Sequence, residues 1–155
     1  METEVRDTGQ SIRECWNEEF LAKCQALVAE WAPRLGLREW RIGVKAEQSS
    51  DVDTLAEVSC TPAALAAIIF VFPPLAKKSD YWVTQCMVHE LLHAKLSPGN
   101  DYLAGELKCI AEATQAESIR RAFSALNEPC IAALAHALVE AWQEKESGDA
   151  KRGKV

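Results

Sequence analysis

The first part of the chain places apolar residues three or four positions apart, which is the spacing of one face of an α-helix. This pattern covers residues 13–31 and follows a polar segment, 1–12, that we expect to be loosely ordered. Pro33 and Gly36 come directly after the pattern, and both residue types end helices. We therefore predict a helix over 13–31, with an apolar face formed by Phe20, Leu21, Cys24, Leu27, Val28 and Trp31.

The middle of the chain changes to the patterns of β-strands. Residues 40–46 alternate between apolar and polar side chains, and a turn-like segment, 48–53, separates them from a second strand at about 55–60. Residues 66–72 contain a run of β-branched and aromatic residues, and two prolines follow it directly. Because proline donates no ladder hydrogen bond, we expect this third strand at an edge of the sheet.

Helices are predicted for the rest of the chain. Ser79 and Asp80 can cap a helix over about 80–96, which the sequence Pro98-Gly99-Asn100 should end. A long helical segment at 101–126 follows. Pro129 suits the first turn of a last helix, over about 129–146.

This order of elements predicts an α+β fold, with a three- or four-stranded sheet on which helix 80–96 packs. We expect a single domain over 1–146 and a mobile polar tail over 147–155. The alanine-rich segment 131–142 is typical of a packing helix, and a dimer face is the alternative, so the oligomeric state stays open.

Composition narrows the possible partners and location. The chain has 155 residues and a net charge of −6, with its basic residues scattered, so we expect no nucleic-acid partner. We see no apolar run long enough to cross a membrane and no secretory signal at the N-terminus, so we expect a cytoplasmic protein without a membrane contact. None of the six cysteines forms a C-x-x-C pair, which indicates free thiols.

The sequence His89-Glu90-Leu91-Leu92-His93 matches the H-E-x-x-H pattern of zinc hydrolases. Residues four apart project from one face of a helix, so His89 and His93 can bind one Zn²⁺ ion. Glu90 lies on the flank of that face, where it can take a proton from a water that the zinc activates. The alternative is a helix with two ordinary, partly buried histidines.

A catalytic zinc site needs a third protein ligand and an open position for water. No other Cys or His follows at short distance, so a carboxylate is favoured. The candidates are Glu106, Glu112 and Glu117 on the following helix. Glu112 and Glu117 lie about 140° apart around a helix and cannot easily both face the metal.

The order of elements and the motifs resemble those of the small gluzincin-type metallopeptidases called minigluzincins. They also resemble those of the metallopeptidases encoded in phages and prophages. The resemblance covers about residues 17–126. It is carried by Leu37-Arg38-Glu39-Trp40-Arg41-Ile42, by Phe72-Pro73, by Val88-His89-Glu90-Leu91-Leu92-His93 and by Glu117-Ser118-Ile119-Arg120-Arg121.

The resemblance implies a zinc-dependent peptidase that cleaves a peptide or protein substrate. His89, His93 and a downstream glutamate, Glu117 with Glu112 as the alternative, would hold Zn²⁺, and Glu90 would be the general base. An edge strand before the active-site helix lines the substrate cleft in that family. We assign this role to the strand Ala67–Phe72, and within it to Ile69, Phe70 and Val71.

Several questions stay open at the level of the sequence. Tyr102 and His136 are candidates for a transition-state stabiliser, although packing roles are the simpler interpretation for both. Cys86 lies on nearly the same helical stripe as the two histidines, where a buried thiol is favoured over a metal ligand. Two other classes of protein stay in view: a zinc-containing binding or regulatory module without catalysis, and a structural helical protein without metal.

Overall fold

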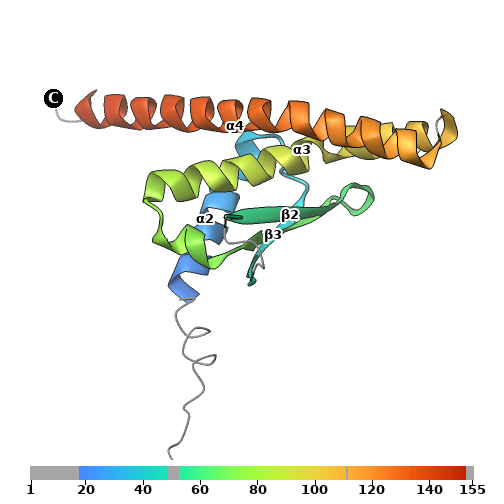
Figure 1. Cartoon of the computed structure of the whole chain (residues 1–155). Coiled ribbons are helices and arrows are strands. Elements are labelled where there is room, and N and C mark those ends of the chain that lie inside the picture. The colour runs from blue at the N-terminus through green and yellow to red at the C-terminus, as the bar shows by residue number, and fades with distance from the viewer. Residues whose placement is uncertain (1–17, 49–52, 111, 153–155) are drawn as a thin grey trace, which may run out of the picture.

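The computed structural model describes residues 18–48, 53–110 and 112–152 (Figure 1). The start of the first predicted helix, the polar segment 1–12, part of the predicted turn and the last residues of the predicted tail lie outside these ranges. The described elements form a mixed α+β fold, which confirms the predicted fold class. Three strands make one sheet in the described part of the chain.

Helix α2, Glu18–Arg34, is the first described element. Its apolar residues lie on one face, and Cys24, Val28 and Trp31 on that face are buried, as the periodicity predicted. The helix continues through Pro33 to Arg34, three residues beyond the predicted end, and Gly36 then adopts a φ of +73°, a conformation that glycine takes without steric cost.

The sheet contains β1 (Arg41–Ala46), β2 (Ala56–Thr61) and β3 (Ala66–Val71) in the order β1-β3-β2. Strand β3 runs parallel to β1 and antiparallel to β2, and the short helix η1 (Pro62–Ala64) joins β2 to β3. The prediction that the third strand lies at an edge is therefore wrong. Its prolines follow the strand, in the short helix η2 (Pro73–Lys77), so they remove no hydrogen bond from the ladder.

Two long helices complete the described chain, α3 (Asp80–Ile110) and α4 (Ala113–Arg152). Both continue through a proline, Pro98 in α3 and Pro129 in α4, so the predicted helix ends near 96 and 126 are wrong. A proline removes one hydrogen bond from a helix, and packing on both sides of it can offset that loss. Helix α4 also runs through 147–152, where we predicted a tail.

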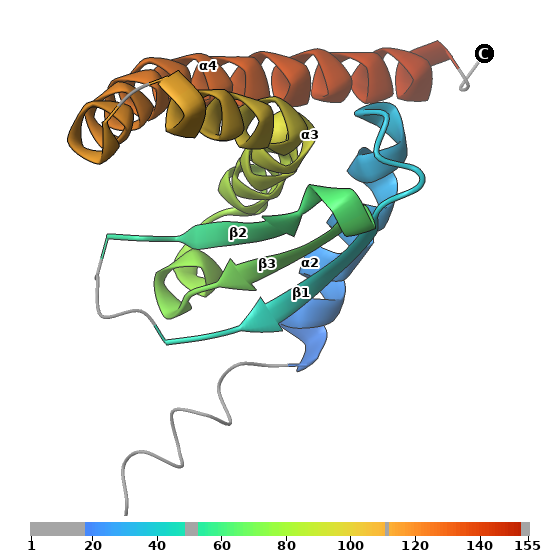
Figure 2. The ribbon, with the colours of Figure 1, turned by 90° about the vertical axis from the view of Figure 1, so that its right-hand side faces the viewer.

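The elements stack in layers, which Figures 1 and 2 show from two directions. Helices α2 and α3 pack on the sheet, and α4 runs across α3 on the side away from the sheet. One core joins all of them, because side chains from α2, β3, α3 and α4 belong to a single buried cluster. The members from α4 are Ile131, Ala135 and Val139.

One described helix, the 113–147 part of α4, is long and apolar enough to cross a membrane by length and composition alone. Only 17% of its apolar window is buried in the molecule. The sequence analysis expected no such segment. Core helices of soluble proteins pass the same test, so this measure by itself assigns α4 no membrane.

The central strand gives a first prediction about stability. Ile69 is fully buried in the middle of β3, whereas Ile68 lies on the opposite face and is only half-buried. Ile69→Ala should lower the free energy of unfolding by about 2–5 kcal/mol, because it removes buried methyl groups and leaves a cavity. Ile68→Ala is the matched control and should cost clearly less in the same urea titration. Equal losses would contradict this account of the core.

Candidate metal centre

Helix α3 brings the two motif histidines together on one face. The Nε2 atoms of His89 and His93 lie 3.0 Å apart, and the centroids of their rings are separated by 4.7 Å. Both side chains are largely buried, with exposed fractions of 20% and 28%. Their spacing of four residues places them on successive turns, as the sequence predicted.

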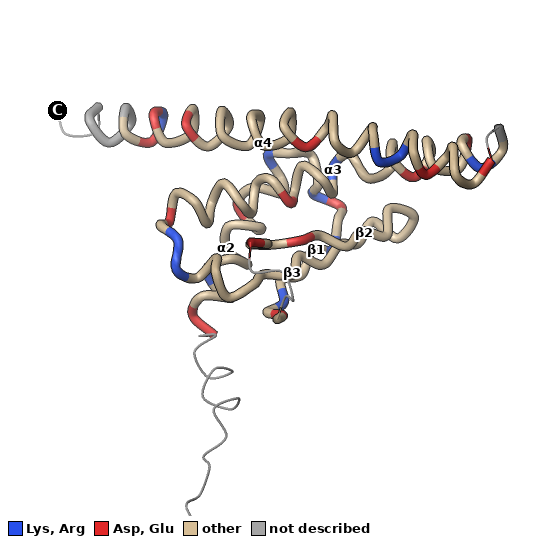
Figure 3. The backbone as a smooth tube through the Cα atoms, viewed as in Figure 1, with Lys and Arg blue, Asp and Glu red and all other residues tan. Residues whose placement is uncertain are grey.

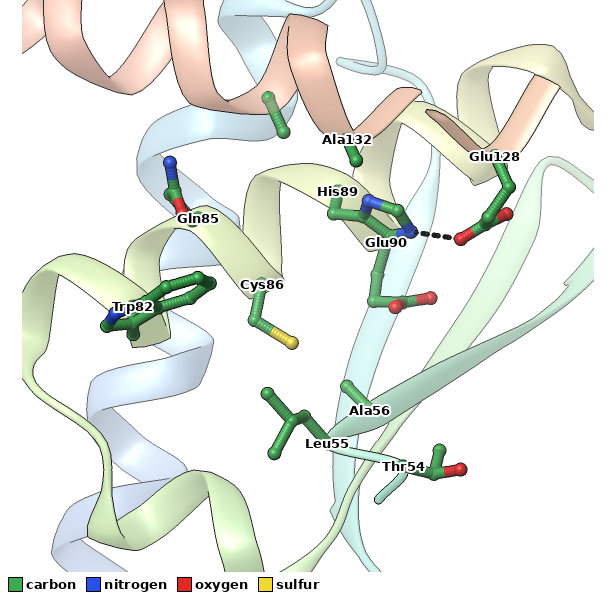
Figure 4. Close-up of a pocket in the computed structure, with 11 residues that line it drawn as sticks. Thr54, Leu55, Ala56, Trp82, Gln85, Cys86, His89, Glu90, Glu128 and Ala132 are labelled. Atoms are coloured by element: carbon green, nitrogen blue, oxygen red, sulfur yellow. Dashed lines mark hydrogen bonds and ion pairs between the residues drawn. The ribbon is translucent and has the colours of Figure 1, made fainter. Parts of the chain in front are cut away.

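Glu128 of α4 supplies a carboxylate to this pair. One carboxylate oxygen lies 2.9 Å from Nε2 of His89 and the other lies 3.2 Å from Nε2 of His93 (Figure 4 shows the first contact). Ligand atoms of the three residues all lie within 4.8 Å of one another. His89, His93 and Glu128 therefore form a group that could hold a metal ion.

Glu128 is the candidate metal ligand that sequence reasoning missed, although the chain contains a signal for it. Ile131, Ala135 and Val139 follow Glu128 at intervals of three, seven and eleven residues, which is the spacing of one helix face. All three are buried against the core. Glu128 is in line with this buried stripe and therefore lies on the side of α4 that packs against α3.

The glutamates proposed from the sequence lie elsewhere. Glu117 pairs with Arg120 at 3.3 Å and with Arg121 at 3.0 Å. It precedes Glu128 by three helical turns, about 16 Å along the axis of α4, so it does not reach the histidines. Glu106 and Glu112 are exposed and belong to no described metal-ligand group. The carboxylate that the fold brings to the histidines is Glu128.

The donor types suit a divalent metal ion such as Zn²⁺. Zinc binds histidine nitrogen and carboxylate oxygen at about 2.0–2.2 Å, so neighbouring donors of a tetrahedral site lie about 3.3 Å apart. The two Nε2 atoms lie 3.0 Å apart, and a different oxygen of Glu128 lies near each of them, at 2.9 and 3.2 Å. Two imidazoles and one carboxylate are also a ligand set of known catalytic zinc sites, which leave one position open.

Glu90 lies beside this group and is almost fully buried, with 6% of its surface exposed. Figure 4 shows its carboxylate below His89, between α3 and β2. Burial raises the pKa of Glu90 to about 7, and the nearby charges of Glu128 and Glu57 add to the rise, while a hydrogen bond from the backbone of Val58 opposes it. The fold thus holds a carboxylate next to the candidate metal ligands without making it one of them.

Strand β2 is the sheet edge that faces the site. A hydrogen bond just before β2 shows which of its residues bond to β3. The carbonyl of Leu55 accepts this bond from the amide of Phe72. Paired residues of an antiparallel ladder alternate, so the backbone groups of Ala56, Val58 and Cys60 point away from β3. These three residues line a cavity of about 410 Å³ that also includes both histidines and Glu90.

The substrate-binding role predicted for Ile69, Phe70 and Val71 needs correction. These residues belong to β3, which pairs with β1 on one side and with β2 on the other. Their backbone groups are used within the sheet, and Ile69 and Val71 are fully buried. In the strand order β1-β3-β2, strand β3 lies in the centre of the sheet. The edge strand next to the candidate metal centre is therefore β2.

A second cavity, of about 300 Å³, opens on the other side of His89 and Glu90. Its wall is mainly apolar and includes Leu55, Trp82 and Cys86 (Figure 4). Burial raises the pKa of the Cys86 thiol to about 12, which keeps it protonated. Cys86 is partly buried against the core, less than the predicted buried thiol, and it lies outside the described metal-ligand group.

The two candidates for a transition-state stabiliser do not contact the cluster in the described structure. Tyr102 is 71% exposed on α3. His136 of α4 contacts the hydroxyl of Tyr81 at 2.7 Å through Nδ1 and forms an ion pair with Glu140 at 3.3 Å. His136 thereby connects α4 to α3, eight residues after Glu128, and has a packing role as the sequence analysis favoured.

Comparisons of the chain with protein-family models, with curated proteins and with solved structures found no match. Function therefore has to be argued from the geometry of the site.

Proposed function

We propose that this protein is a zinc-dependent metallopeptidase. The observation that carries the proposal is the convergence of His89, His93 and Glu128, at distances that suit Zn²⁺, beside the buried carboxylate of Glu90. An H-E-x-x-H helix with a third carboxylate from a later helix is the arrangement of gluzincin-type peptidases. The sequence resemblance and this geometry thus support the same class, with Glu128 in place of Glu117.

The residues of the chain divide the chemistry among them. Zinc, when bound, polarises the peptide carbonyl and lowers the pKa of water. Glu90 takes a proton from the attacking water and later delivers it to the leaving amine. The backbone amide of Val58 holds the Glu90 carboxylate in place, and the buried position of Glu90 keeps it close to the reacting atoms.

Strand β2 is the element that would align the substrate. An extended peptide can add to a sheet edge through backbone hydrogen bonds, and Ala56 and Cys60 present their backbone groups at this edge. The edge runs along the cavity that contains His89 and His93. Binding there would bring a peptide bond next to the metal ligands and Glu90.

The first test is metal content and metal dependence. We expect purified wild-type protein to contain about one zinc per chain, because the site offers three protein ligands. A chelator should remove the zinc and lower hydrolysis of a fluorogenic peptide library at least about 100-fold, and added zinc should restore it.

His93→Ala is the control for this test, since it should neither retain zinc nor respond to its addition. A folded wild-type protein that takes up no zinc would overturn the proposal. Hydrolysis that survives complete removal of the metal would overturn it as well.

A further inference from the structure

Helix α4 carries a second apolar stripe on the side that faces away from the core. Its large members are Ile119 and Phe123, which are 45% and 39% exposed, and Leu126 and Leu134, which are 72% and 49% exposed. Smaller exposed residues continue the stripe between and after them. The whole stripe consists of Ile119, Phe123, Leu126, Cys130, Ala133, Leu134, Ala137 and Ala141.

The stripe lies opposite the buried face of α4. Each residue turns a helix by 100°, which places the stripe about half a turn away from Ile131, Ala135 and Val139. Those three residues pack in the core. Figures 1 and 2 show the other elements on the inner side of α4 and none on its outer side. Leu126 is thus mostly exposed, and Ile119, Phe123 and Leu134 are partly exposed, in the described structure.

The spacing of the stripe suits a second helix. Its members recur at intervals of mostly three and four residues, about 3.7 on average from Ile119 to Ala141, which keeps them on one face of a nearly straight helix. A membrane-spanning role would place all faces of α4 in lipid, including Glu128 and Glu140 and the face that the core already covers. An apolar seam on one face of α4 can be covered by a second helix that packs along that face.

The sizes of the side chains in the stripe indicate that this second helix is α4 of another copy of the chain. In an antiparallel pair of α4 helices centred on Cys130, the two large residues farthest from the centre in one half meet alanines of the other half, and two leucines meet near the centre. Ile119 would face Ala141, Phe123 would face Ala137, and Leu126 would face Leu134. Alternation of large and small residues across an interface allows close packing. A parallel pair would instead oppose Phe123 to Phe123 and Ala137 to Ala137.

The charges on α4 favour the same orientation. The part before Cys130, residues 113–129, carries two arginines and two glutamates, and the part after it, residues 131–147, carries three glutamates and one lysine. Figure 3 shows acidic positions along the length of α4 and basic positions in both of its halves. An antiparallel pair places the acidic half of each helix beside the neutral half of its partner, whereas a parallel pair would place the two acidic halves together.

We propose that this protein forms an antiparallel homodimer through the outer face of α4, with Cys130 at the twofold axis. Such an interface is isologous, because each residue pair occurs twice across the axis. Glu128 points to the opposite side of α4, toward His89, so the dimer leaves the candidate metal centre accessible. The proposal therefore does not depend on the proposed enzymatic function.

Sedimentation equilibrium on the full chain tests the dimer. Wild-type protein should sediment as a dimer at micromolar concentration. Leu126→Glu should raise the dimer dissociation constant at least about 30-fold, because it places a charge in a desolvated seam. Phe123→Glu should act in the same way. Tyr102→Glu, at an exposed aromatic residue outside the stripe, is the matched control and should leave the dimer intact.

Cross-linking tests the orientation. Mild oxidation of wild-type protein should link Cys130 to Cys130 of the partner subunit. In a Cys130→Ser background, a mixture of Ile119→Cys and Ala141→Cys proteins should yield a 119–141 cross-link, identified by mass spectrometry of the peptides.

Three results would overturn the proposal. One is a wild-type monomer throughout the concentration range of the sedimentation experiment. Another is a 119–119 cross-link in place of the 119–141 cross-link, which would show a parallel pair. The third is a monomer that binds phosphatidylcholine vesicles and loses this binding in Leu126→Glu, which would make the stripe a lipid contact.

Discussion

Glu128→Ala should weaken zinc binding at least about 100-fold, since even residues behind the metal ligands change metal affinity by about 10–100-fold. The expectation follows from the contacts of Glu128, which places its two carboxylate oxygens against Nε2 of His89 and of His93. Its loss leaves two protein ligands where a catalytic zinc needs three. Competition with a fluorescent chelator measures the affinity directly.

Glu117→Ala is the matched control for this prediction. It removes a glutamate of the same helix that also forms ion pairs, but its partners are Arg120 and Arg121. Zinc affinity should stay within about threefold of wild type, since exposed ion pairs contribute little. If Glu117→Ala lost zinc and Glu128→Ala kept it, the third ligand would be the one that the sequence resemblance implied, and the observed position of α4 would be wrong.

The second large effect is expected for Glu90→Gln, which should lower kcat for peptide hydrolysis by about 10²–10⁴-fold, the usual contribution of a general base. The amide has the size of the carboxylate, and its oxygen can still accept the hydrogen bond from Val58, but it cannot take a proton. Zinc content should not change, because Glu90 is not one of the three clustered ligands. Steady-state assays measure kcat, and elemental analysis of the same preparation measures the zinc content.

Glu106→Gln is the control variant, since this exposed glutamate lies outside the cluster. It should retain wild-type kcat and zinc content. A Glu90→Gln protein that keeps both its zinc and its full function would contradict the peptidase proposal. That result would favour the alternative of a zinc-containing binding or regulatory module, in which Glu90 has no proton to transfer.

The amino-acid sequence by itself determined the parts of the site that lie close together along the chain. His89 and His93 share a helix face because their spacing of four residues nearly matches the helical repeat, and this local rule needs no tertiary information. The same holds for the buried face of α2 and for the α+β order of elements, which follow from the periodicity of apolar residues.

Only the tertiary structure decided the features that depend on contacts between distant segments. The order β1-β3-β2 places β2 at the edge beside the site, although the prolines after β3 had suggested the reverse. Helix α4 continues through Pro129 because the residues after it pack against the core. Because α4 is continuous, the packing of its later residues also fixes which of its earlier residues lie against α3. This brings Glu128 to the histidines, while Glu117 stays three turns away. Many glutamates of the chain could bind zinc by their chemistry, and packing between α3 and α4 selects one of them.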